Sequence, residues 1–319
     1  MSVVLATAGP FASIRSAVAN LARQDGVPLE LVIAGPREAV HGLVESDRSD
    51  LATFAAWQHG VVPAGTGYDA TRARGVAASR APIVAFAEDH SFPEPDWAVA
   101  LVEAFEGSDW SAVGPVVENG NPGSLVSWAS MLLEYGPWMT AASGGEASHI
   151  PGHNSAYRRE VLLSLGDRLA PMIEAESVLH WQLARHGHRF AIDPRARTRH
   201  MNFSRLWPSI ELRFHVGRQF GSRRVRDWSR AKRALFAAGT PLIPVVRLVR
   251  VLNLPIAHEQ PGIVLRSLPL LTLLVVAATL GELAGYLSAR PGRSTEYLTD
   301  IETDRQRFLN AADRAGAAW

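Results

Sequence analysis

The sequence predicts an α/β protein in which a mostly parallel sheet is covered by helices on both faces and followed by a helical C-terminal extension. Short apolar runs alternate with helix-like stretches through the first half of the chain, which is typical of such sheets. Beyond Arg205 the pattern becomes purely helical. With 319 residues, the chain is long enough for one large domain or two smaller ones.

The expected strands are the short apolar runs, and the expected helices lie between them. Strands are expected at Val3–Ala6, Leu29–Ala34, Pro82–Phe86, Ser111–Val117, Arg189–Ile192 and Thr198–Met201. Helices are expected at Ile14–Ala22, 38–44, 69–78, Pro95–Phe105, Leu125–Tyr135, Arg158–Leu165 and Ser177–His186. Asp69 suits the N-cap of its helix. Residues 136–153, rich in Gly, Ser and Ala, are expected to form a mobile lid or acceptor loop.

Composition restricts the cellular setting more than it restricts the partner. The formal net charge of +1 favours no class of partner. The chain has no cysteine, which excludes disulfides and thiolate metal sites and fits a reducing compartment. The N-terminus has neither a basic region nor a long apolar run, so no cleavable signal peptide is expected. These features predict a cytoplasmic protein.

The C-terminal part combines a basic tract with a hydrophobic segment. Between Arg199 and Arg233 the many basic residues are opposed only by Glu211 and Asp227, but no aromatic platform accompanies them, so no nucleic-acid partner is expected. Residues 262–289 approach the ~20 apolar residues of a membrane span. We expect membrane contact through this segment at the inner face of the cell membrane, the alternative being a buried helix. The domain limits follow as 1–202, 203–260, 261–290 and 291–319.

Two acids and a histidine, Glu88-Asp89-His90, directly follow the apolar run that ends at Phe86 and Ala87. In open α/β sheets, ligands bind at the carboxyl ends of the strands. Carboxylates and imidazole are ligands for divalent metals. The turn is therefore a candidate site for a metal or a nucleotide.

Three segments of residues 1–202 together carry a resemblance to a known family. They are Val3–Thr7 with Gln24, Asp69–Ala77, and Glu88–Trp97. In their order and spacing they resemble family 2 glycosyltransferases of the GT-A fold, and Glu88–Trp97 matches the family's Asp-x-Asp segment. The resemblance implies inverting transfer of one sugar from a nucleotide-sugar donor, UDP-sugar being favoured, to an acceptor hydroxyl. The Gln-x-x-Arg-Trp motif of processive synthases is absent, which favours non-processive transfer.

The resemblance also implies a donor site and a metal site for Mn²⁺ or Mg²⁺. The implied donor-binding residues are Thr7, Asp69, Arg72, Glu88, Asp89 and Asn154. The implied metal ligands are His90, Asp89 and His200, with the choice between His90 and Asp89 left open. Histidine in the third motif position favours Mn²⁺ over Mg²⁺. The aspartate that the family often uses for the base is missing after the second strand, where the chain reads Ala34-Gly35-Pro36-Arg37.

Inverting transfer needs a carboxylate that takes the proton of the acceptor hydroxyl. The segment 174–187 resembles the family's Glu-Asp helix, and alignment on Leu179, Leu183 and Gly187 puts the catalytic aspartate on Glu176. Glu174 is the competing candidate.

Two other functions are compatible with the sequence. A nucleotidyltransferase could use a related sheet, but the chain has no Walker or dinucleotide fingerprint. The substitutions at Glu88 and His90 and the missing base-binding aspartate leave open an inactive, membrane-associated binding or scaffold protein. For an enzyme, the acceptor is expected to be lipid-linked, a glycan or a small molecule, as in cell-envelope or glycoconjugate biosynthesis.

Overall fold

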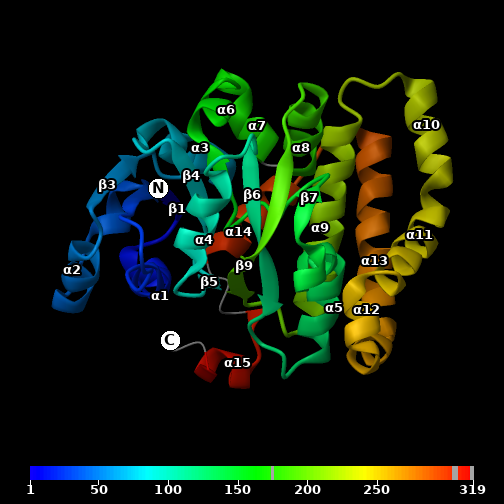
Figure 1. Cartoon of the computed structure of the whole chain (residues 1–319). Helices are drawn as coiled ribbons and strands as arrows, with labels where there is room; N and C mark the ends of the chain where they lie inside the picture. The colour runs from blue at the N-terminus through cyan, green and yellow to red at the C-terminus, as the bar shows by residue number, and fades with distance from the viewer. Residues whose placement is uncertain (174–175, 304–307, 317–319) are drawn as a thin grey trace. The chain divides into compact units, whose positions relative to one another are not determined.

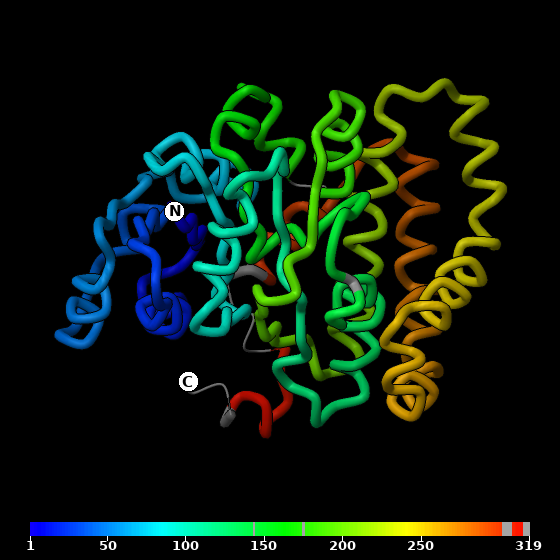
Figure 2. Tube along the Cα trace, in the orientation of Figure 1, coloured from blue at the N-terminus to red at the C-terminus, as the bar shows by residue number. Residues whose placement is uncertain are grey.

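A computed structural model describes residues 1–173, 176–303 and 308–316. The chain forms two compact units (Figure 1). The first unit comprises Met1–Glu118 and Trp138–His200, and the second comprises Asn119–Pro137 and Met201–Trp319. The chain thus enters the second unit once, between Asn119 and Pro137, before it returns to complete the first (Figure 2).

In the described part of the chain, nine strands form one mixed sheet with the order β3-β2-β1-β4-β8-β6-β9-β5, and β7 pairs with β9. The strands are β1 Ser2–Ala6, β2 Glu30–Gly35, β3 Ala56–Val61, β4 Ile83–Ala87, β5 Ser91–Pro93, β6 Ala112–Asn119, β7 Gly145–Ala147, β8 Ala156–Arg158 and β9 Phe190–His200. The strands β1 to β4 pair in parallel, whereas β8 is antiparallel to β4 and β6, and β5 and β7 are antiparallel to β9.

The prediction of a mostly parallel sheet is therefore wrong for its second half. The sequence did not indicate four of the strands. Of these, β5, β7 and β8 have three residues each, and β3 is a mostly exposed or half-buried strand without an apolar run. The two strands expected at 189–192 and 198–201 are one strand, β9. Pro194 lies within β9 but outside its ladders with β7 and β5, because β7 pairs with Phe190–Ile192 and β5 with Thr198–His200.

Helices cover both faces of the sheet, as the sequence predicts. Val3 and Leu5 of β1 pack in one buried cluster with residues of α1, α2 and α4, whereas Val4 packs in another with residues of α3, α6, α7 and α8. Alternate residues of a strand point to opposite faces, which explains this division. These helices are α1 Phe11–Leu21, α2 Glu45–Ala52, α3 Tyr68–Ala78, α4 Trp97–Phe105, α6 Arg159–Leu163, α7 Leu169–Ile173 and α8 Glu176–Arg185.

Two local expectations need correction. Gly67, not Asp69, is the N-cap of α3, so Asp69 lies inside the first turn, where its charge still suits the helix dipole. The helix expected at 38–44 is a short 3₁₀ turn at Arg37–Val40. The segment 136–153, for which a mobile lid or acceptor loop remains the prediction, contains the 3₁₀ turns Gly136–Trp138 and Ala141–Ser143 as well as β7.

The second unit is helical. Its helices are α5 Leu125–Glu134, α9 Leu206–Arg224, α10 Arg230–Gly239, α11 Ile243–Leu252, α12 Pro255–Glu259, α13 Pro261–Ser288, α14 Ser294–Thr303 and α15 Ala311–Gly316. Helices α9 and α13 touch through glycines. A Cβ atom on Gly217 of α9 would lie 2.0 Å from the carbonyl oxygen of Ala278, and one on Gly281 of α13 would lie 2.0 Å from that of Phe214. One side of α13 is therefore buried against α9.

Two stretches of the described chain are long and apolar enough to cross a membrane, Arg230–Leu252 and Pro261–Ser288. In Pro261–Ser288, 44 % of the most apolar 18-residue stretch is buried, so this helix lies partly inside the unit. In Arg230–Leu252 only 11 % of the corresponding stretch is buried. Core helices of soluble proteins also have such length and composition.

Candidate metal and donor site

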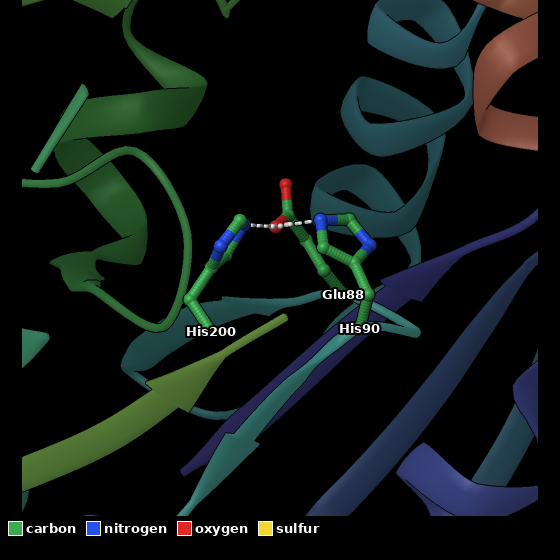
Figure 3. Close-up of side chains that lie close together, drawn as sticks. All are labelled: Glu88, His90 and His200. Atoms are coloured by element: carbon green, nitrogen blue, oxygen red, sulfur yellow. Dashed lines mark ion pairs between the residues drawn. The ribbon is translucent and has the colours of Figure 1, made fainter. Parts of the chain in front are cut away.

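Three side chains converge at the carboxyl end of β4, namely those of Glu88, His90 and His200 (Figure 3). Glu88 and His90 belong to the turn between β4 and β5, and His200 is the last residue of β9. Because β5 pairs antiparallel with β9, His200 lies opposite Ser91 and thus beside His90. All three side chains are buried, and one ligand atom from each lies within 4.8 Å of the others.

The two imidazole rings direct nitrogen atoms at one carboxylate oxygen. Nε2 of His90 lies 3.0 Å and Nε2 of His200 lies 4.0 Å from Oε2 of Glu88. One carboxylate oxygen with two imidazole nitrogens suits Mn²⁺ and its neighbours among the divalent transition metals better than Mg²⁺, which prefers oxygen ligands. The residues present therefore fit the divalent metal that the sequence predicts.

Asp89, the alternative to His90 as a metal ligand, lies outside this group. Its Oδ1 lies 2.6 Å from Nδ1 of His90, the ring nitrogen that points away from Glu88. A carboxylate on the outer nitrogen of a ligating histidine fixes the tautomer and the orientation of the ring. Glu88, expected to contact the nucleoside, lies among the candidate ligands instead.

Sequence analysis missed His153, which also contacts Glu88. Its Nδ1 lies 3.1 Å from Oε1 of Glu88, and its ring stacks on that of His200 with a centroid distance of 5.3 Å. Burial raises the pKa of Glu88, but the charges of His153 and His90 outweigh burial and hold that pKa well below its usual range. No spacing in the sequence indicated His153, because the fold alone brings its loop to the end of β4.

Asn154 was expected to bind the donor, yet its side chain is fully buried. Its Nδ2 donates to Oγ of Ser91 at 2.5 Å and to Oγ1 of Thr198 at 2.7 Å. The backbone carbonyl oxygen of Asn154 accepts from Nε1 of Trp97 at 2.9 Å, and the backbone of Asn154 has a positive φ of 52°. Asn154 therefore ties together the segments that carry His90 and His200, and this explains why an asparagine occupies a left-handed position.

Glu176 is the first residue of α8, and two contacts position its carboxylate. Nη1 of Arg72 donates to Oε1 of Glu176 at 3.1 Å. The carboxylate also lies directly over Gly152, where a Cβ atom would be 1.5 Å from its Cδ. Only glycine leaves room for the carboxylate in this place. Glu174, the competing candidate, lies outside the described residues.

Arg72 was expected to bind the donor, but its buried guanidinium is committed to protein groups. Besides Glu176, it donates from Nη2 to the carbonyl oxygen of Gly152 at 2.7 Å and stacks on the ring of Phe86, 4.2 Å from its centroid. Arg72 therefore connects α3, the loop before β8 and α8. This arrangement identifies Arg72 as the residue that holds Glu176.

The two remaining donor candidates lie near the ends of their elements. Thr7 follows β1 and is buried, and its Oγ1 accepts from the backbone N–H of Gly9 at 3.1 Å. Because β1 and β4 are parallel, Thr7 and Glu88 lie at the same edge of the sheet. Asp69 is half-buried in the first turn of α3.

No family profile matches this sequence. Nor does any curated protein show a significant sequence match to it. Among solved structures, the chain is similar to the mannosyltransferase PcManGT from Pyrobaculum calidifontis, whose structure contains GDP-Man and Mn²⁺. The TM-score is 0.55 with 17 % identity, over 88 % of this chain and 86 % of that one. This chain has a GT-A fold.

Two other similar structures have lower TM-scores. S. aureus TarS 1–349 in complex with UDP gives a TM-score of 0.47 with 13 % identity, over 97 % of this chain and 92 % of that one. GalNAc-T7 with UDP, GalNAc and Mn²⁺ also gives 0.47, with 12 % identity. Here the similarity covers 63 % of this chain but only 42 % of GalNAc-T7, so this chain spans less than half the length of that protein.

Proposed function

We propose that this protein transfers one sugar from a nucleotide-sugar donor to an acceptor hydroxyl with inversion of configuration. The observation that carries the proposal is the cluster of Glu88, His90 and His200 at the carboxyl edge of a GT-A sheet. A UDP-sugar is our preferred donor, because UDP is the commonest donor nucleotide of the enzymes that the sequence resembles. The acceptor would be lipid-linked, a glycan or a small molecule.

In this proposal the cluster holds the divalent metal and Asp89 orients the ring of His90. A divalent metal at such a site neutralises the negative charge that develops on the departing diphosphate. Asp89 is 22 % exposed at its side chain, whereas Glu88 and His90 are more deeply buried. The donor diphosphate would therefore approach the cluster from the side on which Asp89 meets solvent.

Glu176 is the proposed general base. The acceptor oxygen forms a bond to the anomeric carbon on the face opposite the diphosphate, the bond between that carbon and the diphosphate oxygen breaks, and the hydroxyl proton passes to the Glu176 carboxylate. Arg72 holds this carboxylate in one orientation. The side chain of Glu176 is 31 % exposed, so an acceptor can reach its carboxylate.

The variant Glu176→Gln tests this role. We expect the rate of sugar transfer to fall at least about a hundredfold, because general-base catalysis contributes that much to the rate. Binding of UDP with Mn²⁺ should be retained. Glu160→Gln is the matched control, since Glu160 is an exposed acid in the first turn of the neighbouring helix α6. Both variants are measured by release of UDP with UDP-sugars and by calorimetric titration with UDP and Mn²⁺.

Other outcomes of this experiment would contradict the proposal in distinct ways. Full transfer activity in Glu176→Gln would exclude Glu176 as the base. Nucleotide binding by the natural chain without transfer or hydrolysis of any nucleotide sugar would identify an inactive binding protein instead.

We also propose that the enzyme works at the cytoplasmic face of a membrane, which the apolar stretches at 230–252 and 261–288 support.

A further inference from the structure

We propose that helices α10 and α11 lie flat in the headgroup region of an anionic membrane without crossing it. The surface concerned, called here the α10–α11 face, consists of six apolar side chains that are between 41 % and 70 % exposed. They are Leu235, Leu242, Val245, Val246, Val249 and Leu252. This inference concerns a surface of the second unit and does not depend on the proposed reaction.

The first argument is that α11 is apolar on both sides but covered on only one. Its inner side packs on α13 through the buried Val251, and Arg247 on that side forms an ion pair with Glu282 of α13. The outer side carries Val245, Val249 and Leu252, which recur every three or four residues and so share one face of the helix. The apolar face of a helix is normally covered by another apolar surface.

The charges around this face determine what covers it. From residue 212 to residue 258 the chain contains many arginines but only one acid, Asp227. Arg230 at the start of α10 and Arg250 beside Val249 are both exposed. Anionic headgroups complement this combination of apolar and basic side chains. A second copy of the chain would instead oppose one positive surface to another.

Other features argue against a span. The stretch from Arg230 to Leu252 is interrupted by a 3₁₀ turn at Thr240–Leu242 and by Pro241 and Pro244. It also carries two arginines, Arg247 and Arg250, in its second half, and charged side chains inside the hydrocarbon region are costly. The stretch is therefore suited to the interface, where basic side chains reach the headgroups.

The neighbouring helix α13 supports the same conclusion. It lies in backbone contact with α9 through Gly281 and Gly217. Helix α9 carries several arginines, and its buried Arg213 is paired with Glu134 of α5. A span formed by α13 would bring this polar helix into the bilayer with it. We therefore interpret α13 as the apolar support on which α10 and α11 are held.

Flotation of the full-length chain with vesicles tests the proposal. We expect binding to an equimolar mixture of phosphatidylcholine and phosphatidylglycerol to exceed binding to phosphatidylcholine alone by at least about tenfold, and to weaken with salt. The double variant Val245→Glu/Val249→Glu removes apolar contact, and Arg230→Glu/Arg250→Glu reverses two charges. Each is expected to weaken binding to the mixed vesicles by about tenfold or more.

The control is Val61→Glu/Leu163→Glu, which places two glutamates at exposed apolar sites of the first unit. It should bind vesicles as the natural chain does. Equal vesicle binding by Val245→Glu/Val249→Glu would overturn the proposal. The proposal would also be overturned if light scattering showed that the natural chain is a dimer and that Val245→Glu/Val249→Glu is a monomer. The face would then be an interface between copies.

Spin labels distinguish a surface helix from a span. The chain has no cysteine, so single cysteines at positions 235, 242 and 249 can be labelled cleanly. For a helix in the interface we expect all three labels at a similar shallow depth of about 5–10 Å, measured by oxygen accessibility. Depths that increase toward the bilayer centre and then decrease along the series would show a span and contradict the inference.

Discussion

Adjacent residues of the turn after β4 make different contacts, and the difference depends on the direction of each side chain. His90 directs Nε2 toward Glu88, whereas Asp89 contacts the opposite nitrogen of the same ring. The sequence places both residues at the strand end, but cannot decide which of them reaches the cluster. The antiparallel pairing of β5 with β9 decides it, because this pairing brings His200 to the same place.

This arrangement predicts different effects for the two residues. His90→Ala removes a proposed ligand and should abolish measurable Mn²⁺ binding in the presence of UDP, whereas Asp89→Asn should weaken it by about 10–100-fold, because a partner that orients a ligand contributes less than the ligand. Calorimetric titration measures both. His186→Ala is the control, since His186 is an exposed residue just beyond α8. Unchanged Mn²⁺ affinity in Asp89→Asn would exclude the orienting role.

Among the elements, α13 shows what hydropathy leaves open. For residues 262–289 the sequence predicts membrane contact, with a buried helix as the alternative, because hydropathy records only that a helix is apolar. The structure buries one side of this helix against α9, with Gly217 and Gly281 at the closest approach. The small side chains allow the two backbones to touch, as they do in tightly packed helix pairs.

The contact predicts opposite effects for two glycine substitutions in α13. Gly281→Val places a side chain against the backbone of α9 and should lower the free energy of unfolding by about 3 kcal/mol or more, since even moderate overpacking costs 1–3 kcal/mol. Gly262→Ala, with nothing within 4 Å of the added Cβ, should raise it by about 0.5–1 kcal/mol. Urea unfolding of the full chain measures both, and equal effects would contradict the close packing.

For the whole molecule, buried histidines make the stability depend on pH. His180 of α8 lies in the core between Tyr157 and Phe190, and its Nε2 lies 2.9 Å from the Tyr157 hydroxyl. Burial, with a smaller effect of His149, lowers the pKa of His180 from 6.5 to about 3. In the unfolded chain His180 therefore takes up a proton below pH 6.5, whereas in the folded chain it remains neutral.

The unfolded state thus binds more protons than the folded state between the two pKa values, and acid destabilises the fold. As the pH falls below 6.5, we expect His180 to reduce the free energy of unfolding by up to about 1.4 kcal/mol per pH unit. Urea titrations from pH 7.5 downward measure this slope. His180→Gln keeps a polar group beside Tyr157 but does not titrate, so the free energy of unfolding of this variant should fall less steeply with pH. Equal slopes in the variant and the natural chain would show that His180 does not cause the pH dependence.

The sequence by itself determined the class of the fold, the strands β1, β2 and β4 of the parallel half of the sheet and the turn at Glu88–His90, because these depend on local hydrophobic periodicity and on the end of a strand. Only the tertiary structure decided the antiparallel half, the assignment of Asp89 to the outer nitrogen of His90, the contact of His153 with Glu88, and the use of Arg72 to hold Glu176. The antiparallel half and the contacts of His153 and Arg72 join residues far apart in the chain, and the contact of Asp89 with His90 depends on where distant His200 lies. No local pattern records which distant segments the fold brings together.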